Sequence, residues 1–119
     1  MGWEKVGNLG PKVPGLIVAG SVSSALTPDA ALGNYRDITV TGANVTVNEP
    51  TNGVNRQTLE FAFYASVATT ITFASAIEKT SGLELPIPVP IGEILWASLK
   101  FSTLPNPDKW YLVAATVSK

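Results

Sequence analysis

The stretch Gln57–Phe73 constrains the fold of this chain most, because large apolar side chains alternate along it with small or polar ones. Leu59, Phe61 and Phe63 share one face of the first half, and the same alternation resumes after a short link at Ser66–Ala68. A period of two places successive side chains on opposite faces of a β-strand. We therefore expect an antiparallel strand pair whose aromatic face forms the centre of a sandwich.

Strand-like segments and turns follow one another on both sides of this stretch. Alternating residues at Asp37–Thr41 and a turn at Pro50–Asn55 precede it, and two longer alternating segments, Glu93–Ser102 and Trp110–Val117, follow it. About eight short strands with regularly spaced turns are typical of sandwiches and jelly rolls. The sequence predicts an all-β protein, with an antiparallel β-sandwich or jelly-roll-like domain over residues 34–119.

Residues 1–33 differ from the rest, since glycine and proline interrupt every potential long element. The apolar residues Trp3, Val6, Leu9 and Val13 lie among them, whereas a disordered linker is normally poor in such residues. We expect an extended N-terminal arm that docks these residues on a neighbouring subunit. The alternative is a loose tail with one stabilising strand at Gly15–Ala19.

The composition favours a surface shielded by other subunits. Of the 119 residues 45% are hydrophobic but only 14% are charged, where about 25% is usual. A surface rich in threonine, serine and asparagine is the alternative. The net charge of −1 with scattered basic residues argues against nucleic-acid binding, and the apolar run Leu16–Leu26 is too short and interrupted to span a membrane.

Several kinds of chemistry lack their residues. The chain has no cysteine and no histidine, so it has no thiolate site and no histidine base for a serine triad. Ser98 and Lys100 share a strand face, and Glu60 and Glu93 are the acids in mid-strand, but all four fit an outward, solvated position. The nine acidic residues show no metal-ligand spacing. We expect no enzyme, no cofactor and no metal.

Two further groups of residues are candidates for contact with a partner. Pro86, Pro88 and Pro90 alternate through Leu85–Ile91, which predicts an edge strand or a polyproline II stretch. Such a segment either contacts a partner or protects the sheet edge from aggregation. Trp96 lies in a segment that is apolar on both faces, so we expect it to be buried on both sides and to join the prolines as a subunit contact. The aromatic residues Tyr64, Trp96, Trp110 and Tyr111 also offer rings for a sugar platform, although such residues more often belong to a core or an interface.

The opening GWEKVGNLGPKVPG resembles the N-termini of tail and minor structural proteins of phages of actinobacteria, on Trp3, Val6, Leu9, Gly10 and Pro11. The collagen-like repeat that often follows in those proteins is missing. The body resembles small β-sandwich domains of phage virions. The matching pieces are Val45–Pro50, Gly53, Leu59–Phe63, Thr70–Phe73, Pro86–Pro90 and the closing WYLVA at 110–114.

The resemblance implies a virion protein, made in the host cytoplasm and placed on the capsid exterior. It favours a capsid decoration (cement) protein that forms a homotrimer and binds the major capsid protein through its arm, thereby stabilising the head. The alternative is a tail-fibre or tail-tip domain that binds a glycan receptor. A cellular carbohydrate-binding module is a third class, which predicts a monomer with an exposed aromatic platform.

Overall fold

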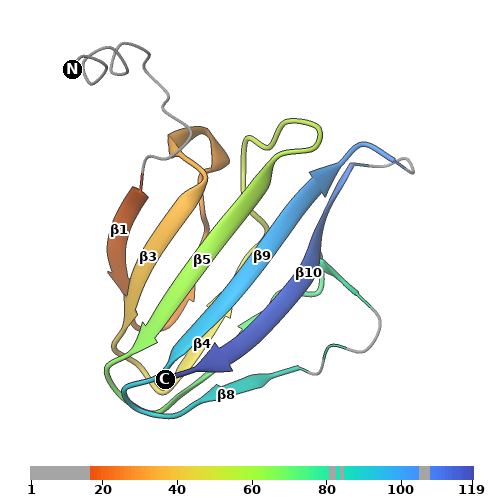
Figure 1. Cartoon of the computed structure of the whole chain (residues 1–119). Helices are drawn as coiled ribbons and strands as arrows, with labels where there is room; N and C mark the ends of the chain where they lie inside the picture. Colours follow the sequence, from red (N-terminus) through yellow and green to blue (C-terminus); the bar gives the residue numbers. More distant parts are fainter. Residues whose placement is uncertain (1–16, 81–82, 84, 105–107) are drawn as a thin grey trace, which may run out of the picture.

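The computed structural model describes residues 17–80, 83, 85–104 and 108–119. They form two β-sheets packed face to face, which confirms the expected all-β sandwich (Figure 1). The strand order is β1-β3-β5-β9-β10-β7 in the six-stranded sheet and β2-β4-β6-β8 in the four-stranded sheet. The strands are β1 Ile17–Val22, β2 Ala25–Leu26, β3 Tyr35–Val40, β4 Asn44–Val47, β5 Thr58–Ala65, β6 Thr69–Phe73, β7 Glu78–Lys79, β8 Ile87–Val89, β9 Ile94–Ser102 and β10 Lys109–Ser118.

The first six strands alternate between the two sheets, and this makes their pairing parallel. β1, β3 and β5 lie side by side in the larger sheet, and β2, β4 and β6 do so in the smaller one. The prediction that Gln57–Phe73 folds into an antiparallel pair is therefore wrong. The link at Ser66–Ala68 carries the chain from β5 in one sheet to β6 in the other, and the two strands face each other across the core.

Antiparallel pairing appears only in the second half of the chain. β9 lies antiparallel to β5, β10 to β9, and β8 to β6. The expected edge position of the proline-containing segment is confirmed, since β8 is the outermost strand of the smaller sheet and contains Pro88. The sandwich is thus a mixed one, wound first as a parallel coil and then closed by antiparallel strands.

The core follows the alternation read from the sequence. Leu59, Phe61 and Phe63 of β5 are buried, and the two phenylalanine rings stack with centroids 5.2 Å apart. Ile71 and Phe73 of β6 approach from the other sheet and are equally buried. Burying each of these side chains contributes roughly 1.5–3 kcal/mol relative to leaving it exposed. Their neighbours at the centre of the core are Val40, Val45, Ile77, Leu95, Leu99, Trp110 and Leu112.

The sandwich begins before the boundary expected at residue 33. β1 pairs with β3 along its whole length, from Ile17 opposite Tyr35 to Val22 opposite Val40, and β2 joins the other sheet. Short strands between glycines and prolines are enough to add to an existing sheet, because the parallel register with β3 supplies the hydrogen bonds. Residues 17–33 are therefore part of the folded domain and not of an extended arm.

A buried arginine holds the turn between β2 and β3. Arg36 of β3 is only 5% exposed, and its guanidinium donates to the backbone oxygens of Asp29 and Gly33, the latter at 2.9 Å. These contacts pin the short 3-10 turn Ala30–Leu32, which Asp29 caps by accepting from the amide of Ala31. Burial lowers the pKa of Arg36, and the charge of Asp29 opposes that shift.

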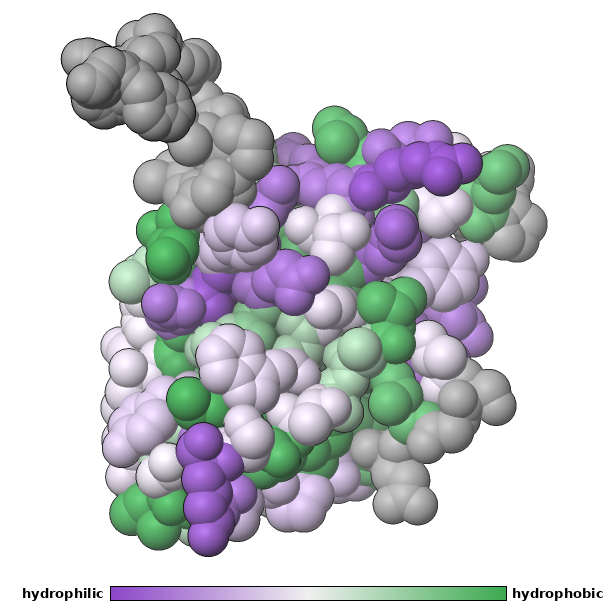
Figure 2. Space-filling model, viewed as in Figure 1, coloured by the Kyte–Doolittle hydropathy of each residue, from purple (hydrophilic) through white to green (hydrophobic). Residues whose placement is uncertain are grey.

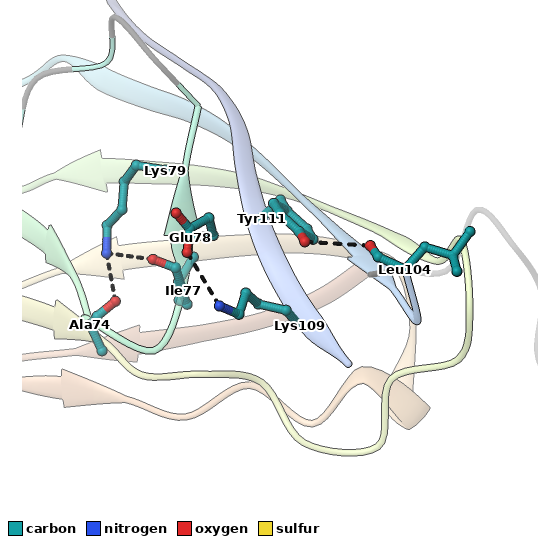
Figure 3. A network of polar contacts seen from close by, with 7 residues as sticks. All are labelled: Ala74, Ile77, Glu78, Lys79, Leu104, Lys109 and Tyr111. Carbon is teal, nitrogen blue, oxygen red and sulfur yellow. Dashed lines mark hydrogen bonds and ion pairs between the residues drawn. The ribbon is translucent and has the colours of Figure 1, made fainter. Parts of the chain in front are cut away.

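A small group of polar contacts surrounds β7 (Figure 3), and the strand pairs with β10 through its backbone. The Nζ of Lys79 donates to the carbonyl oxygens of Ala74 and Ile77, each at 2.6 Å. Burial lowers the pKa of Lys79, and the neighbouring carboxylate of Glu78 acts in the opposite direction. Glu78 also pairs with Lys109 of β10 at 3.4 Å, an exposed contact that contributes little to stability. The two-residue strand is therefore held mainly by backbone contacts.

Candidate functional site

Exposed aromatic residues gather on the outer face of the six-stranded sheet. Trp96 of β9 is 49% exposed, Tyr64 of β5 45% and Tyr35 of β3 41%, and Ile17 of β1 is exposed beside them. Figure 2 shows this face: residues of intermediate hydropathy and apolar residues cover its middle, and strongly hydrophilic residues gather toward the top of the view. A face of this composition is typical of a binding surface.

The register of the sheet creates a hollow in this face. Ala19, Asp37, Ala62 and Trp96 stand opposite one another on four neighbouring strands. Ala19 and Ala62 have small side chains, so the sheet surface is low at β1 and β5, and larger side chains stand around these positions. The hollow has a volume of about 370 Å³ and is lined by Ala19, Gly20, Asp37, Ile38, Thr39, Ala62, Tyr64, Ile94 and Trp96.

The two sides of the hollow differ in chemistry. The indole N–H of Trp96 donates to the hydroxyl of Ser118 at 2.9 Å, which orients the ring, and Tyr64 stands on the neighbouring strand. On β3 lie the carboxylate of Asp37, opposite Ala62, and the hydroxyl of Thr39, opposite Tyr64. Within the described part of the chain Asp37 forms no ion pair. Asp37 therefore faces Trp96 across Ala62 from two strands away, roughly 10 Å, whereas Thr39 lies directly beside Tyr64.

Trp96 is 49% exposed in the single chain, so the described residues leave its outer face uncovered. The expectation that this face is covered, and the role of Trp96 as a subunit contact, both stay predictions. Of the four aromatic residues considered for a sugar platform, Tyr64 and Trp96 line the hollow together. Trp110 is 1% exposed and packs in the core against Phe101, which confirms the favoured core position for this residue and removes it from any platform.

The proline segment lies on a different surface from Trp96. Pro86, Pro88 and Pro90 are exposed, and Pro88 stands opposite Thr70 at the edge of the four-stranded sheet. A second hollow of about 280 Å³ lies here, between β6 and β8. The hydroxyl of Thr69 beside it is buried and makes no hydrogen bond to any described residue. The prolines and Trp96 therefore cannot form one continuous contact, and if both bind subunits they do so separately.

The four arm residues lie outside the described residues: Trp3, Val6, Leu9 and Val13. Their proposed contact with a capsid stays a prediction.

The residues considered for catalysis sit on the sheet surface. Ser98 donates to Glu60 at 3.0 Å, and Glu60 is exposed on β5. Among the described residues no group of three or more acidic, histidine or cysteine side chains is placed to hold a metal ion. The sequence did not single out Asp37, Thr39 or Ala62, because their meeting depends on a parallel register that alternation alone does not reveal.

No protein-family model, curated protein or solved structure matches the chain. In the described segments no helix has the length and apolar character needed to cross a membrane.

Proposed function

We propose that this chain is a non-enzymatic structural protein of a tailed-phage virion that works as a homo-oligomer, joined through the open edges of its six-stranded sheet. The observation that carries the proposal is that, in the described part of the chain, strand segments at both ends of this sheet have no neighbour on their outer side. The role that the sequence resemblance favours is capsid decoration, in which the oligomer binds the major capsid protein on the outside of the head and stabilises it.

The first open segment is β1. Natural proteins protect sheet edges with short strands, charges or prolines. β2 has two residues, β7 is a charged pair, and β8 is three residues long and contains Pro88. β1 has six residues, IVAGSV, without charge or proline, and among the described strands only β3 pairs with it.

The second open segment is the end of β10. β7 pairs only with Tyr111 and Leu112, so it leaves the following residues, 114–118, without a neighbour on that side in the described structure. A contact between β1 of one copy and this segment of the next is head-to-tail, and head-to-tail contacts generate a closed ring when the rotation between copies closes. The expected homotrimer is the simplest ring of this kind.

The direction of the backbone shows which β1 groups face outward. The carbonyl of Val22 accepts from the amide of Thr41, the residue after β3, so the backbone groups of Val22 point toward β3. Along a strand these groups alternate in direction, and those of Ser21 therefore point away from β3. Replacing Ser21 by proline removes an N–H that a second copy needs but that the fold does not use.

Co-sedimentation with purified capsids that lack their own decoration protein tests the proposal. We expect the wild-type protein and Ser21→Thr to pellet with the capsids and to raise their melting temperature. Ser21→Pro should bind much more weakly while keeping its own circular dichroism spectrum. Deleting the first twelve residues should abolish capsid binding if the arm holds the lattice. Wild-type protein that stays in the supernatant would contradict the decoration role.

A tail-fibre or tail-tip receptor-binding domain is the second candidate, and the aromatic hollow is the observation that favours it. Adsorption of purified protein to host cells, competed by free glycans, would support this candidate over decoration.

A further inference from the structure

The hollow on the outer face of the six-stranded sheet has the composition of a small-molecule site. Its volume of about 370 Å³ lies within the range of ligand pockets, roughly 300–1,000 Å³. Trp96 and Tyr64 supply its aromatic surface, Ala62 its floor, and Asp37 and Thr39 its polar groups. Such sites combine apolar or aromatic walls with a few polar groups that fix the orientation of the ligand.

We propose that this hollow binds a saccharide, with one C–H face of a sugar ring against Trp96 and Tyr64 and with sugar hydroxyls donating to the carboxylate of Asp37. The proposal deepens the second candidate function, since it rests on glycan recognition and names the site and ligand class. It does not depend on the open edges of the sheet.

The position of Asp37 favours a saccharide over an apolar ligand. An apolar molecule filling the hollow would remove water from the carboxylate without replacing its hydrogen bonds, which is costly. A sugar ring offers apolar C–H groups on its face and hydroxyl donors at its rim, so it can pack against the aromatic rings and donate hydrogen bonds to the carboxylate at the same time. The indole N–H of Trp96 is already bonded to Ser118, which leaves the ring of Trp96 to act through its surface.

The same geometry disfavours a compact organic cation. Quaternary ammonium groups are bound by aromatic rings that surround them. Here Trp96 lies two strands from Asp37, roughly 10 Å away, and Tyr64 lies diagonally from Asp37 on the adjacent strand, so the two rings do not surround the carboxylate. A small cation at Asp37 would therefore contact Tyr64 at most, whereas a sugar ring extends from Asp37 across Ala62 to Trp96.

The first experiment is an NMR titration of the full-length, ¹⁵N-labelled protein with the methyl glycosides of galactose, glucose and N-acetylglucosamine, and separately with choline chloride. A glycan array covers larger ligands. We expect at least one saccharide to shift the amide signals of Ala62 and Tyr64 and the indole signal of Trp96. If choline shifts these signals and no saccharide does, the hollow is a cation site and the proposal is wrong.

Four variants then locate the site, each measured with the best saccharide. Trp96→Ala should raise Kd about tenfold or more. Ala62→Leu should weaken binding similarly by filling the floor while removing no side-chain contact. Asp37→Asn, which keeps acceptor capacity, should have a smaller effect. Tyr35→Ala is the control, because Tyr35 is an exposed aromatic residue on the same face that does not line the hollow.

Melting temperatures check that each variant is folded. If Trp96→Ala and Ala62→Leu both bind the saccharide with the wild-type Kd, the proposed site is wrong, but the receptor-binding function is still supported at another surface. If neither the array nor the titration detects saccharide binding, both the proposed site and the receptor-binding function are wrong.

Discussion

Gly42 shows how closely single residues determine the path of this chain between its sheets. A Cβ at Gly42 would lie 1.8 Å from the carbonyl oxygen of Ser23, a backbone atom that cannot move aside alone. We expect Gly42→Ala to lower the free energy of unfolding by about 1–3 kcal/mol, the usual cost of overpacking.

Urea denaturation measures this effect, with Gly20→Ala as the matched control. Nothing lies within 4 Å of a Cβ at Gly20, so Gly20→Ala should leave stability unchanged or raise it by up to about 1 kcal/mol. Equal midpoints for the two variants would show that the turn at Gly42 is looser than described.

A second prediction at the scale of single residues concerns Arg36. Replacing Arg36 by methionine keeps most of the packing but leaves the carbonyl oxygens of Asp29 and Gly33 without their donor. The expected loss is about 1–3 kcal/mol. Arg56→Met is the control, because Arg56 is exposed, and it should change stability by no more than about 0.5 kcal/mol. Thermal unfolding monitored by circular dichroism compares the two, and an Arg36→Met protein as stable as wild type would contradict the clamping role.

At the scale of elements, β8 is an edge strand in which Pro88 replaces a hydrogen-bond donor. Pro88→Thr restores an N–H on the open side of β8 and should therefore increase aggregation on prolonged incubation, with little change in stability. Light scattering over time measures this. Pro90→Thr, just outside the strand, is the control and should aggregate at the wild-type rate. If the Pro88→Thr protein scatters no more light than the wild-type protein, Pro88 does not protect the edge of the sheet from aggregation.

The inner faces of the strands were predictable from the sequence, but their sheet membership was not. The alternation at Leu59, Phe61 and Phe63 identifies the buried face correctly. It is the same whether the next strand turns back beside β5 or crosses to the facing sheet, because the core-facing side chains are apolar in both cases. The parallel coil of β1 to β6 therefore lay beyond what the pattern could reveal, and so did the contribution of residues 17–33.

The candidate site was predictable only in part for the same reason. Tyr64 and Trp96 stand out in the sequence as large aromatic residues. Asp37 and Ala62 do not, since an aspartate and an alanine at outward strand positions are ordinary. Their meeting with Trp96 in one row requires β3 to lie parallel to β5 and β5 antiparallel to β9.

At the scale of the whole molecule, the low content of charged residues and the open sheet edges both favour assembly of several copies. Only 14% of the residues are charged, and the uncharged β1 and the end of β10 lie at opposite ends of one sheet. Joining copies through these ends covers backbone groups that otherwise face water, and it leaves the hollow at Trp96 on the open face. Assembly and saccharide binding are therefore compatible in one particle.

Sedimentation velocity of the full-length protein over a range of concentrations shows whether the chain assembles through its sheet edges. We expect a trimer for the wild-type protein and for Ser21→Thr, and a monomer with unchanged secondary structure for Ser21→Pro. A wild-type protein that sediments as a monomer at every concentration, or a Ser21→Pro protein that still forms the same oligomer, would contradict this assembly.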